Sequence, residues 1–498
     1  MSYKDISHSQ EFLILDLYIY GELFLEAVIR LVFMRKIKGA DSPGNLELKR
    51  ELGLAAAVAI VVGNCIGSGI FTSAASLAAA SNPRTAILAW VITAAGSLLI
   101  ALSFASLGTA LPRTGGPIVY TRAAFGDFAG FLIAWTYWIG AWVGNAAIIT
   151  AFMLYFTYFI PATATPVFAF LITSGVLWLF TIINILGVKG AGRVSIITTV
   201  LKVGALVVFV IIAALHFNPA MLGTVSSARV SGMSTLPAAI AIALWAFVGI
   251  ESATVPAGEI KNPEKNIRKS TIYGTLLAAG VYIIVSVVGM GVLDQSALAN
   301  SNAPLADIIN KATGGTWGGN FIALGAIIST LGASSGWILT TARSAFGASQ
   351  DKLFPAVFGK IHPKYLTPVN SLIISGLFAN VLLILNYLGT LSSAFNFMLL
   401  LATLAFLPAY AFSAAADIIL LKNRPSEFNI FSFLKNSFFA LLAFGYSIYA
   451  IYGTGSTVVM YGFILMLLGI PVYLFMMLQN NKRDKIVDNL RKDAGLDN

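Results

Sequence analysis

A run of small and polar residues at positions 63–71 interrupts a long apolar segment near the start of the chain. The segment extends from about Leu54 to Ala80 and carries Gly-Asn-Cys-Ile-Gly-Ser-Gly-Ile-Phe at its middle. A glycine costs about 1 kcal/mol relative to alanine in a helix, and unpaired backbone groups in lipid are costlier still. A membrane span broken here is tolerable only where its backbone lines a cavity. Secondary transporters expose helix ends to substrate in this way.

Gly67, Ser68 and Gly69 are the residues of this run that suit a ligand. A half-helix beginning there presents free N–H groups and the positive end of its dipole. These bind a carboxylate without a cationic side chain, and Ser68 adds a hydroxyl donor. Close helix packing is the alternative, because Gly63 and Gly67 form a small-xxx-small pair. We favour packing for Gly63 and substrate binding for the other three residues.

Two charged residues lie deep in predicted spans. Glu251 falls in a second interruption, at residues 248–254, and an intramembrane acid is a functional candidate by default. Burial disfavours its ionised form, so Glu251 is a candidate proton carrier; a structural role in the broken helix is the alternative. Lys202 lies too deep for easy snorkelling. We expect its ammonium to bind carbonyls freed by the first break, in place of a coupling sodium ion, although an interfacial lysine is the simpler interpretation.

Aromatic side chains and one amide complete the candidate site. Tyr137 and Asn145 lie on the third predicted span, Trp245 on the sixth and Trp337 on the eighth. Tryptophan usually marks the membrane interface, whereas these positions are mid-span. They could close over a substrate or stack on a cationic group. Core packing is the default for any single tryptophan, and convergence with Asn145 favours a gate.

The composition is that of a protein embedded in a membrane. The chain has 498 residues, of which 58% are hydrophobic and only 10% charged, unlike any soluble domain of this length. Apolar runs of about 20 residues favour helices over a β-barrel. We predict an all-α polytopic membrane protein with 12 transmembrane helices. The predicted spans cover residues 54–80, 84–110, 128–160, 165–187, 192–216, 235–258, 268–292, 318–348, 368–388, 391–416, 431–452 and 456–480.

The basic residues orient these spans. The chain carries 31 Lys and Arg against 21 Asp and Glu. Most of the Lys and Arg residues fall in loops on one side of the membrane, whereas Arg84, Arg229 and Lys311 fall on the other side. By the positive-inside rule, both termini are cytosolic and the protein is a multi-pass component of the cell membrane. The positive charge therefore needs no nucleic acid partner.

Two interruptions in corresponding spans predict an inverted repeat with a site at the midplane. We expect repeats of five helices each at residues 48–225 and 226–425, with helices 11 and 12 at 426–480 and a cytosolic tail at 481–498. A short external helix is expected at 303–313. Residues 1–47 form an extension with an amphipathic pattern. Within this extension, residues 1–33 are either an interfacial helix or upstream sequence before a natural start at Met34.

Other chemistries find little support. A single cysteine and three scattered histidines indicate no metal site, and we expect no cofactor. The chain lacks the phosphate-binding loop of ATP-driven pumps. It also lacks paired aspartates or a Ser–Lys dyad at a depth that suits an intramembrane enzyme. We therefore do not expect the protein to be an enzyme.

Several motifs resemble the amino acid–polyamine–organocation superfamily, in particular its basic amino acid and polyamine antiporters, which include arginine–agmatine antiporters. They lie at residues 63–71, 137–145, 245–251, 261–263 and 336–337, followed by 353–355. The resemblance covers about residues 48–480. It implies the LeuT-like fold, a 5+5 inverted repeat with broken helices 1 and 6, and a carrier that works by alternating access.

The resemblance also implies residue roles. Ser68 and the amides of Gly67 and Gly69 would bind the substrate carboxylate, and the carbonyls of Cys65, Trp245 and Val248 its amine. Asn145 and Trp337 would contact the side chain, with Trp245 as a gate and Glu251 as the proton-sensitive carboxylate. Lys202 matches a lysine found elsewhere in the superfamily, in carriers of cationic and large neutral amino acids.

One departure concerns the tenth span. Leu401 and Ala405 stand where the arginine carriers offer a serine and a threonine, which suits a neutral substrate, while Glu251 and Asn145 still permit a cationic one. We therefore expect a sodium-independent amino acid carrier, by exchange or proton coupling. A sensor without flux and a polyamine exchanger are the alternatives. A homodimer is one assembly that we consider.

Overall fold

The computed structural model describes residues 48–223, 232–387, 391–422 and 430–478. Every regular element in these residues is a helix, and the one extended contact is an isolated bridge between Leu52 and Ile260. Eleven described helices are long and apolar enough to cross a membrane. The N-terminal extension with Met34, Arg229 and the predicted tail fall outside the described residues.

The helices follow the predicted spans closely. The first span comprises α2 (Leu54–Cys65) and α3 (Gly69–Ala80), and the sixth begins with α9 (Leu236–Phe247). The remaining spans are α4 (Pro83–Ala110), α6 (Asp127–Phe159), α7 (Pro166–Leu186), α8 (Val188–Leu215), α10 (Pro263–Met290), α13 (Trp317–Gln350), α14 (Val369–Tyr387), α15 (Leu391–Lys422), α16 (Ile430–Gly453) and α17 (Ser456–Leu467). All twelve predicted positions hold a helix, although α9 alone is too short to count as a span.

The first span is broken more narrowly than its sequence indicates. Helix α2 ends at Cys65 and α3 begins at Gly69, so only residues 66–68 leave the helix. The amide of Ile66 still donates to the carbonyl of Val62 at 2.7 Å, and Ser68 is the N-cap of α3. The break therefore exposes little backbone, all of it inside the protein.

The second half of span 6 is not an α-helix, so the interruption predicted at residues 248–254 continues to the expected end of the span at residue 258. After Phe247 the chain runs through turns to residue 256 and a 3₁₀ turn at Ala257–Glu259. The amide of Ser252 donates to the carbonyl of Gly249 at 2.9 Å, a three-residue spacing too tight for an α-helix. Gly249 has φ +118°, which residues with a β-carbon rarely adopt. The sequence therefore loosens the helix at this glycine.

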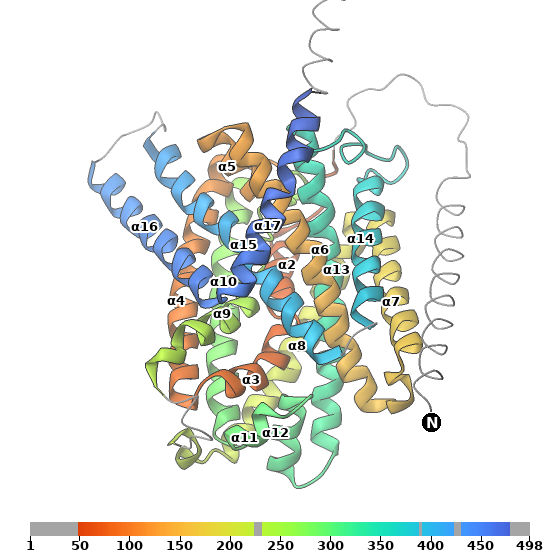
Figure 1. Ribbon diagram of the computed structural model, residues 1–498, viewed down its shortest axis with the longest axis vertical. Coiled ribbons are helices and arrows are strands. Elements are labelled where there is room, and N and C mark those ends of the chain that lie inside the picture. The colour runs from red at the N-terminus through yellow and green to blue at the C-terminus, as the bar shows by residue number, and fades with distance from the viewer. Residues whose placement is uncertain (1–47, 224–231, 388–390, 423–429, 479–498) are drawn as a thin grey trace, which may run out of the picture.

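Short helices cover the two ends of the bundle. Helix α12 (Pro304–Thr313) is the predicted external helix, whereas α5 (Pro117–Phe125) and α11 (Gln295–Ala299) were not predicted. In Figure 1, α5 lies at the top and α11 and α12 at the bottom. The connections at the α5 end carry most of the described Lys and Arg residues, and we refer to it as the basic end.

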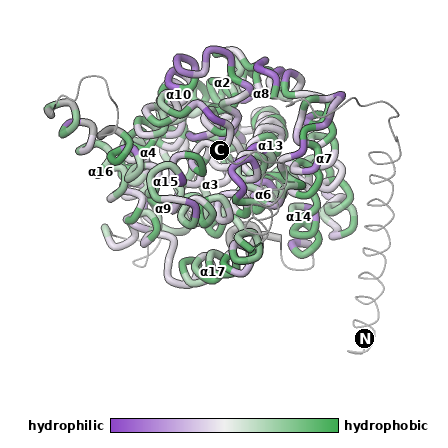
Figure 2. The backbone as a smooth tube through the Cα atoms, turned by 90° about the horizontal axis from the view of Figure 1, so that it is seen from above, coloured by the Kyte–Doolittle hydropathy of each residue, from purple (hydrophilic) through white to green (hydrophobic). Residues whose placement is uncertain are grey.

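Buried helices lie at the centre and lipid-facing ones at the edge. Helix α13 packs against α6 and α8, and small residues allow close contacts; a β-carbon on Gly325 of α13 would lie 2.7 Å from that of Ala205 in α8. Seen from above, α16 and α17 lie at the periphery and α7 pairs with α14 on another flank (Figure 2). The core therefore surrounds the two interruptions.

Candidate functional site

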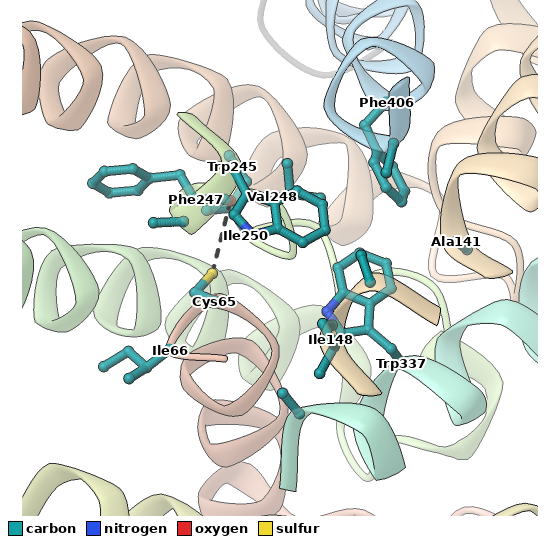
Figure 3. Close-up of a cluster of buried hydrophobic side chains, with 14 of the residues drawn as sticks. Cys65, Ile66, Ala141, Ile148, Trp245, Phe247, Val248, Ile250, Trp337 and Phe406 are labelled. Carbon is teal, nitrogen blue, oxygen red and sulfur yellow. Dashed lines mark hydrogen bonds between the residues drawn. The ribbon is translucent and has the colours of Figure 1, made fainter. Parts of the chain in front are cut away.

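The break in span 1, the turns after α9 and the middle of α13 meet at a small central pocket. The pocket encloses about 10 Å³, so its walls must separate before an amino acid can enter. Figure 3 shows several of these walls, with the rings of Trp245 and Trp337 near Ile148 and Cys65. The lining residues are Asn64, Cys65, Gly67, Ser68, Gly69, Ile148, Trp245, Val248 and Trp337. Every predicted substrate-binding residue except Asn145 is among them.

The start of α3 has hydrogen-bond donors without acceptors. Ser68 is 1% exposed and its hydroxyl oxygen is buried without a partner. The amide of Gly67 donates to the carbonyl of Cys65 at 2.8 Å, and that of Phe71 to the carbonyl of Ser68 at 3.1 Å. Among the described residues, the amides of Gly69 and Ile70 between them have no acceptor. Such a set of buried donors suits an anion.

Gly69 also permits a close contact between the two broken spans. A β-carbon at this position would lie 2.8 Å from the Cα of Ala246 in α9. Backbone atoms cannot yield as a flexible side chain does. Any larger residue would push α3 away from α9 and displace the free amides.

Acceptors face these donors from the other side of the pocket. The carbonyl of Trp245 accepts the amide of Val248 at 3.2 Å, and among the described residues the carbonyl of Val248 receives no hydrogen bond. Cys65 approaches the carbonyl of Phe247 through its Sγ at 3.8 Å, the dashed line in Figure 3. An amino group beside these carbonyls could donate to Val248.

Asn64 joins the two interruptions to α13. Its Nδ2 donates to Ser252 Oγ at 2.8 Å and to Thr340 Oγ1 at 3.1 Å. Its carbonyl accepts the indole N–H of Trp337 at 3.3 Å. One buried side chain therefore fixes the register between spans 1, 6 and 8.

Asn145 does not line the central pocket. Its Oδ1 accepts a hydrogen bond from Ser334 at 3.0 Å, and the residue lines a separate small cavity with Trp142, Thr181 and Ser375. The sequence places it correctly on α6 but does not show which helix face it occupies.

Lys202 lies where the first break exposes carbonyl groups. Its Nζ donates to the carbonyls of Ile66 at 2.6 Å, Gly63 at 3.0 Å and Ser329 at 3.3 Å. The side chain is fully buried. Its hydrogen-bonded partners in the described chain are carbonyl dipoles rather than a carboxylate, so the ammonium occupies a cation site built from backbone oxygens.

Glu251 is held by donors from three elements. Tyr137 donates to its Oε1 at 2.8 Å and Tyr410 to its Oε2 at 2.7 Å. The amide of Gly249 lies 3.2 Å from Oε2. The carboxyl group thus ties the turns after α9 to α6 and α15. Tyr137 contacts Glu251 but does not line the central pocket.

The basic end is closed by a buried ion pair and a backbone contact. Arg343 and Glu259 are both fully buried and form two hydrogen bonds of 2.9 Å. The carbonyl of Glu259 also accepts the amides of Glu51 and Leu52. At the opposite end a cavity of about 310 Å³ opens beside α3, lined by Thr72, Ser76 and residues 299–302 among others. The two ends of the protein therefore differ: the basic end is packed closed, whereas the opposite end carries an open cavity beside α3 that shares no lining residue with the central pocket.

Nearly the whole described chain matches the model of a protein family. Residues 52–479 match the sequence profile of the family described as amino acid permease. The chain belongs to the amino acid permease family. This permease is 33% identical over 463 residues to a putative arginine/ornithine antiporter of Bacillus subtilis, covering 86% of this chain and 98% of that protein.

Two further relatives of the permease have similar names. An arginine/ornithine antiporter of Lactococcus lactis is 31% identical over 459 residues, which are 86% of this chain and 90% of that protein. An arginine/agmatine antiporter of Chlamydia pneumoniae is 32% identical over 442 residues, 85% of this chain and 90% of that protein. The resemblance stated from the motifs is thereby confirmed, as is an all-helical membrane protein of this family.

Sequence reasoning missed several residues of the permease site. Asn64, Ile148, Ser329 and Tyr410 all lie at the pocket or beside the two charged groups. The mid-span position of Asn64 was a usable signal, since a buried amide needs partners. Tyr410 offered none, because nothing local to α15 indicates that it faces Glu251.

Proposed function

We propose that this permease exchanges α-amino acids with cationic side chains, such as arginine and ornithine, across the cell membrane by alternating access. The observation that carries the proposal is the unpaired donor set of Ser68, Gly69 and Ile70 opposite the carbonyl of Val248. A zwitterion satisfies both sides at once. The names of the relatives supply the cationic side chain and the exchange mode.

The two tryptophans of the pocket define where the side chain of the substrate lies. With the carboxylate at the start of α3, the substrate extends between Trp245 and Trp337. A guanidinium or ammonium beside an indole face gains roughly 0.5–2 kcal/mol. Neither Leu401 nor Ala405 lines the pocket in its closed form.

Charged groups couple the pocket to the moving parts. Lys202 takes the role of a coupling cation, which makes exchange sodium-independent, and Glu251 with Tyr137 and Tyr410 closes the path toward the basic end. That end faces the cytosol, with both termini, by the positive-inside rule. Residues 48–225 and 226–425 form the two repeats, 426–480 the added helices, and spans 1, 2, 6 and 7 rock against the others.

A flux assay tests the proposal. Purified protein in liposomes preloaded with unlabelled ornithine should take up radiolabelled arginine, and liposomes without internal substrate should take up little. Liposomes without protein, and an excess of external glycine, serve as controls. Arginine binding with no flux in any loading would identify a sensor instead. Exchange of putrescine in preference to arginine would favour the polyamine carrier.

A further inference from the structure

A second hollow lies at the basic end, remote from the central pocket. It encloses about 420 Å³ between α4, α10, α15 and α16. This volume falls within the range of about 300–1,000 Å³ typical of small-molecule sites. Figure 1 shows the upper part of α16 leaning away from α4 at this end. The cavity therefore opens where four helices from different parts of the fold separate.

Two cationic side chains line this cavity from opposite helices. Arg268 extends from α10 and Lys435 from α16, and both are exposed. Neither has an ion pair or hydrogen bond to any residue that the structure describes. Cationic groups that share one cavity without a partner attract an anion.

The polar wall between them comes from α4 and α15. Ser103, Ser106 and Thr109 lie on α4, and Ser106 donates to Asp417 Oδ1 at 2.7 Å. Asp417 is 5% exposed, so the single carboxylate of the lining is held against the wall. The hydroxyls of Ser106 and Thr109 already donate within the protein, and two cations against one carboxylate leave the cavity positive.

An apolar surface continues directly from the cavity. On α10, Tyr273 and Leu276 are 56% and 48% exposed, and on α16, Leu434 and Phe438 are 59% and 57% exposed. Arg268 and Lys435 each lie six residues into their helix, counting its first residue. At about 1.5 Å per residue this is some 8 Å from the helix end, which is the depth of lipid headgroups. A ligand there meets charge at one end and hydrocarbon at the other.

We propose that this cavity binds the headgroup of an anionic phospholipid from the leaflet at the basic end. The phosphate lies between Arg268 and Lys435, and the acyl chains follow the exposed apolar faces of α10 and α16. Basic pockets between transmembrane helices bind such headgroups. A free phosphate ion would satisfy the cations but leave the adjoining apolar surface without a function.

The position of the cavity gives the lipid a mechanical role. Helices α4 and α10 are spans 2 and 7, which belong to the set that moves in the proposed exchange, whereas α15 and α16 are spans 10 and 11. A headgroup bound to both α10 and α16 bridges the two sets. Anionic lipid should therefore stabilise the arrangement that is closed at the basic end.

The test compares melting temperatures in nanodiscs of phosphatidylcholine alone and of phosphatidylcholine mixed with phosphatidylglycerol. The double variant Arg268→Gln/Lys435→Gln removes the proposed ligands. The variant Lys269→Gln/Lys360→Gln removes two exposed lysines from the same end outside the cavity, as the matched control. Native mass spectrometry counts the phosphatidylglycerol retained by each protein.

We expect phosphatidylglycerol to raise the melting temperature of the wild type and the control equally, and the double variant to lose most of that shift and one retained lipid. Inorganic phosphate added to phosphatidylcholine nanodiscs should produce no shift. Equal lipid responses in the double variant and the control would overturn the proposal, as would a full shift with phosphate alone. Should the double variant fail to fold, the single variants Arg268→Gln and Lys435→Gln answer the same question through retained lipid.

Discussion

The ammonium of Lys202 donates to the carbonyl of Ile66 at 2.6 Å, at the point where α2 has ended and α3 has not begun. Lys202 also reaches the carbonyls of Gly63 and Ser329. A break that leaves carbonyls unpaired needs a cation, and the chain supplies its own. The charge therefore stays with the protein through every transport cycle.

Sodium-independent exchange is the expected consequence of this contact. Arginine–ornithine exchange in proteoliposomes should proceed at the same rate when choline replaces sodium on both sides. Lys202→Ala should lower the melting temperature and the rate, because three buried carbonyls lose a donor. The carbonyl of Ile66 keeps the Ser329 hydroxyl as a donor, and a buried group left unsatisfied costs about 1–3 kcal/mol. Lys189→Ala, an exposed lysine on the same helix, should change neither. A strict requirement for sodium in the wild type would contradict the account.

Gly69 should tolerate no side chain. Gly69→Ala places a β-carbon about 2.8 Å from the Cα of Ala246, which displaces the amides that we assign to the carboxylate. We expect exchange to fall by at least about tenfold, as for loss of one hydrogen bond to a charged group, while expression is kept. Gly204→Ala is the matched control, since nothing lies within 4 Å of its β-carbon. Equal activity in the two variants would remove Gly69 from the site.

Glu251 should determine the response to pH. Glu251→Gln cannot change its charge, and its NH2 group replaces the oxygen that accepts from one of the two hydroxyl groups, that of Tyr137 or that of Tyr410. The rate of exchange should become insensitive to pH over the range in which the wild type varies. Glu264→Gln makes the same change at an exposed site and should leave the pH profile intact. An unaltered profile in Glu251→Gln would assign proton sensitivity elsewhere.

The Arg343–Glu259 pair should show strong coupling. Removing one partner, in Arg343→Met or Glu259→Met, leaves an uncompensated buried charge and should cost about 3–5 kcal/mol. The double variant should lose much less free energy of unfolding than the two single variants lose together. Thermal unfolding of all four proteins measures this coupling. Additive losses would mean that the two groups act independently despite their 2.9 Å contacts.

Local patterns predicted the spans and the first break because each depends on residues close in sequence. Ser68 could be assigned a donor role for the same reason: the start of a half-helix exposes its amides wherever that helix packs. The second break was harder. Its glycine was visible, but the loss of the α-helix after Phe247 depends on Asn64 and on Glu251, whose partners lie over a hundred residues away.

The orientation of side chains across helices was the least predictable property. Asn145 and Tyr137 lie two turns apart on α6, yet one faces α13 and the other faces Glu251. Helix α6 is apolar on nearly all sides, so the sequence shows no preferred face. Tyr410 was missed for the same reason on α15. Only the packed structure decides which polar group meets which.

The most direct test of the central claim is whether the start of α3 binds the substrate carboxylate. Calorimetry would measure Kd for arginine and for agmatine, which lacks the carboxylate, with the wild type and Ser68→Ala. A hydrogen bond to a charged group contributes about 1.5–3 kcal/mol. Ser68→Ala should therefore raise the Kd for arginine by roughly 10–100-fold and leave the Kd for agmatine nearly unchanged. Equal weakening of both ligands, or of neither, would contradict the account.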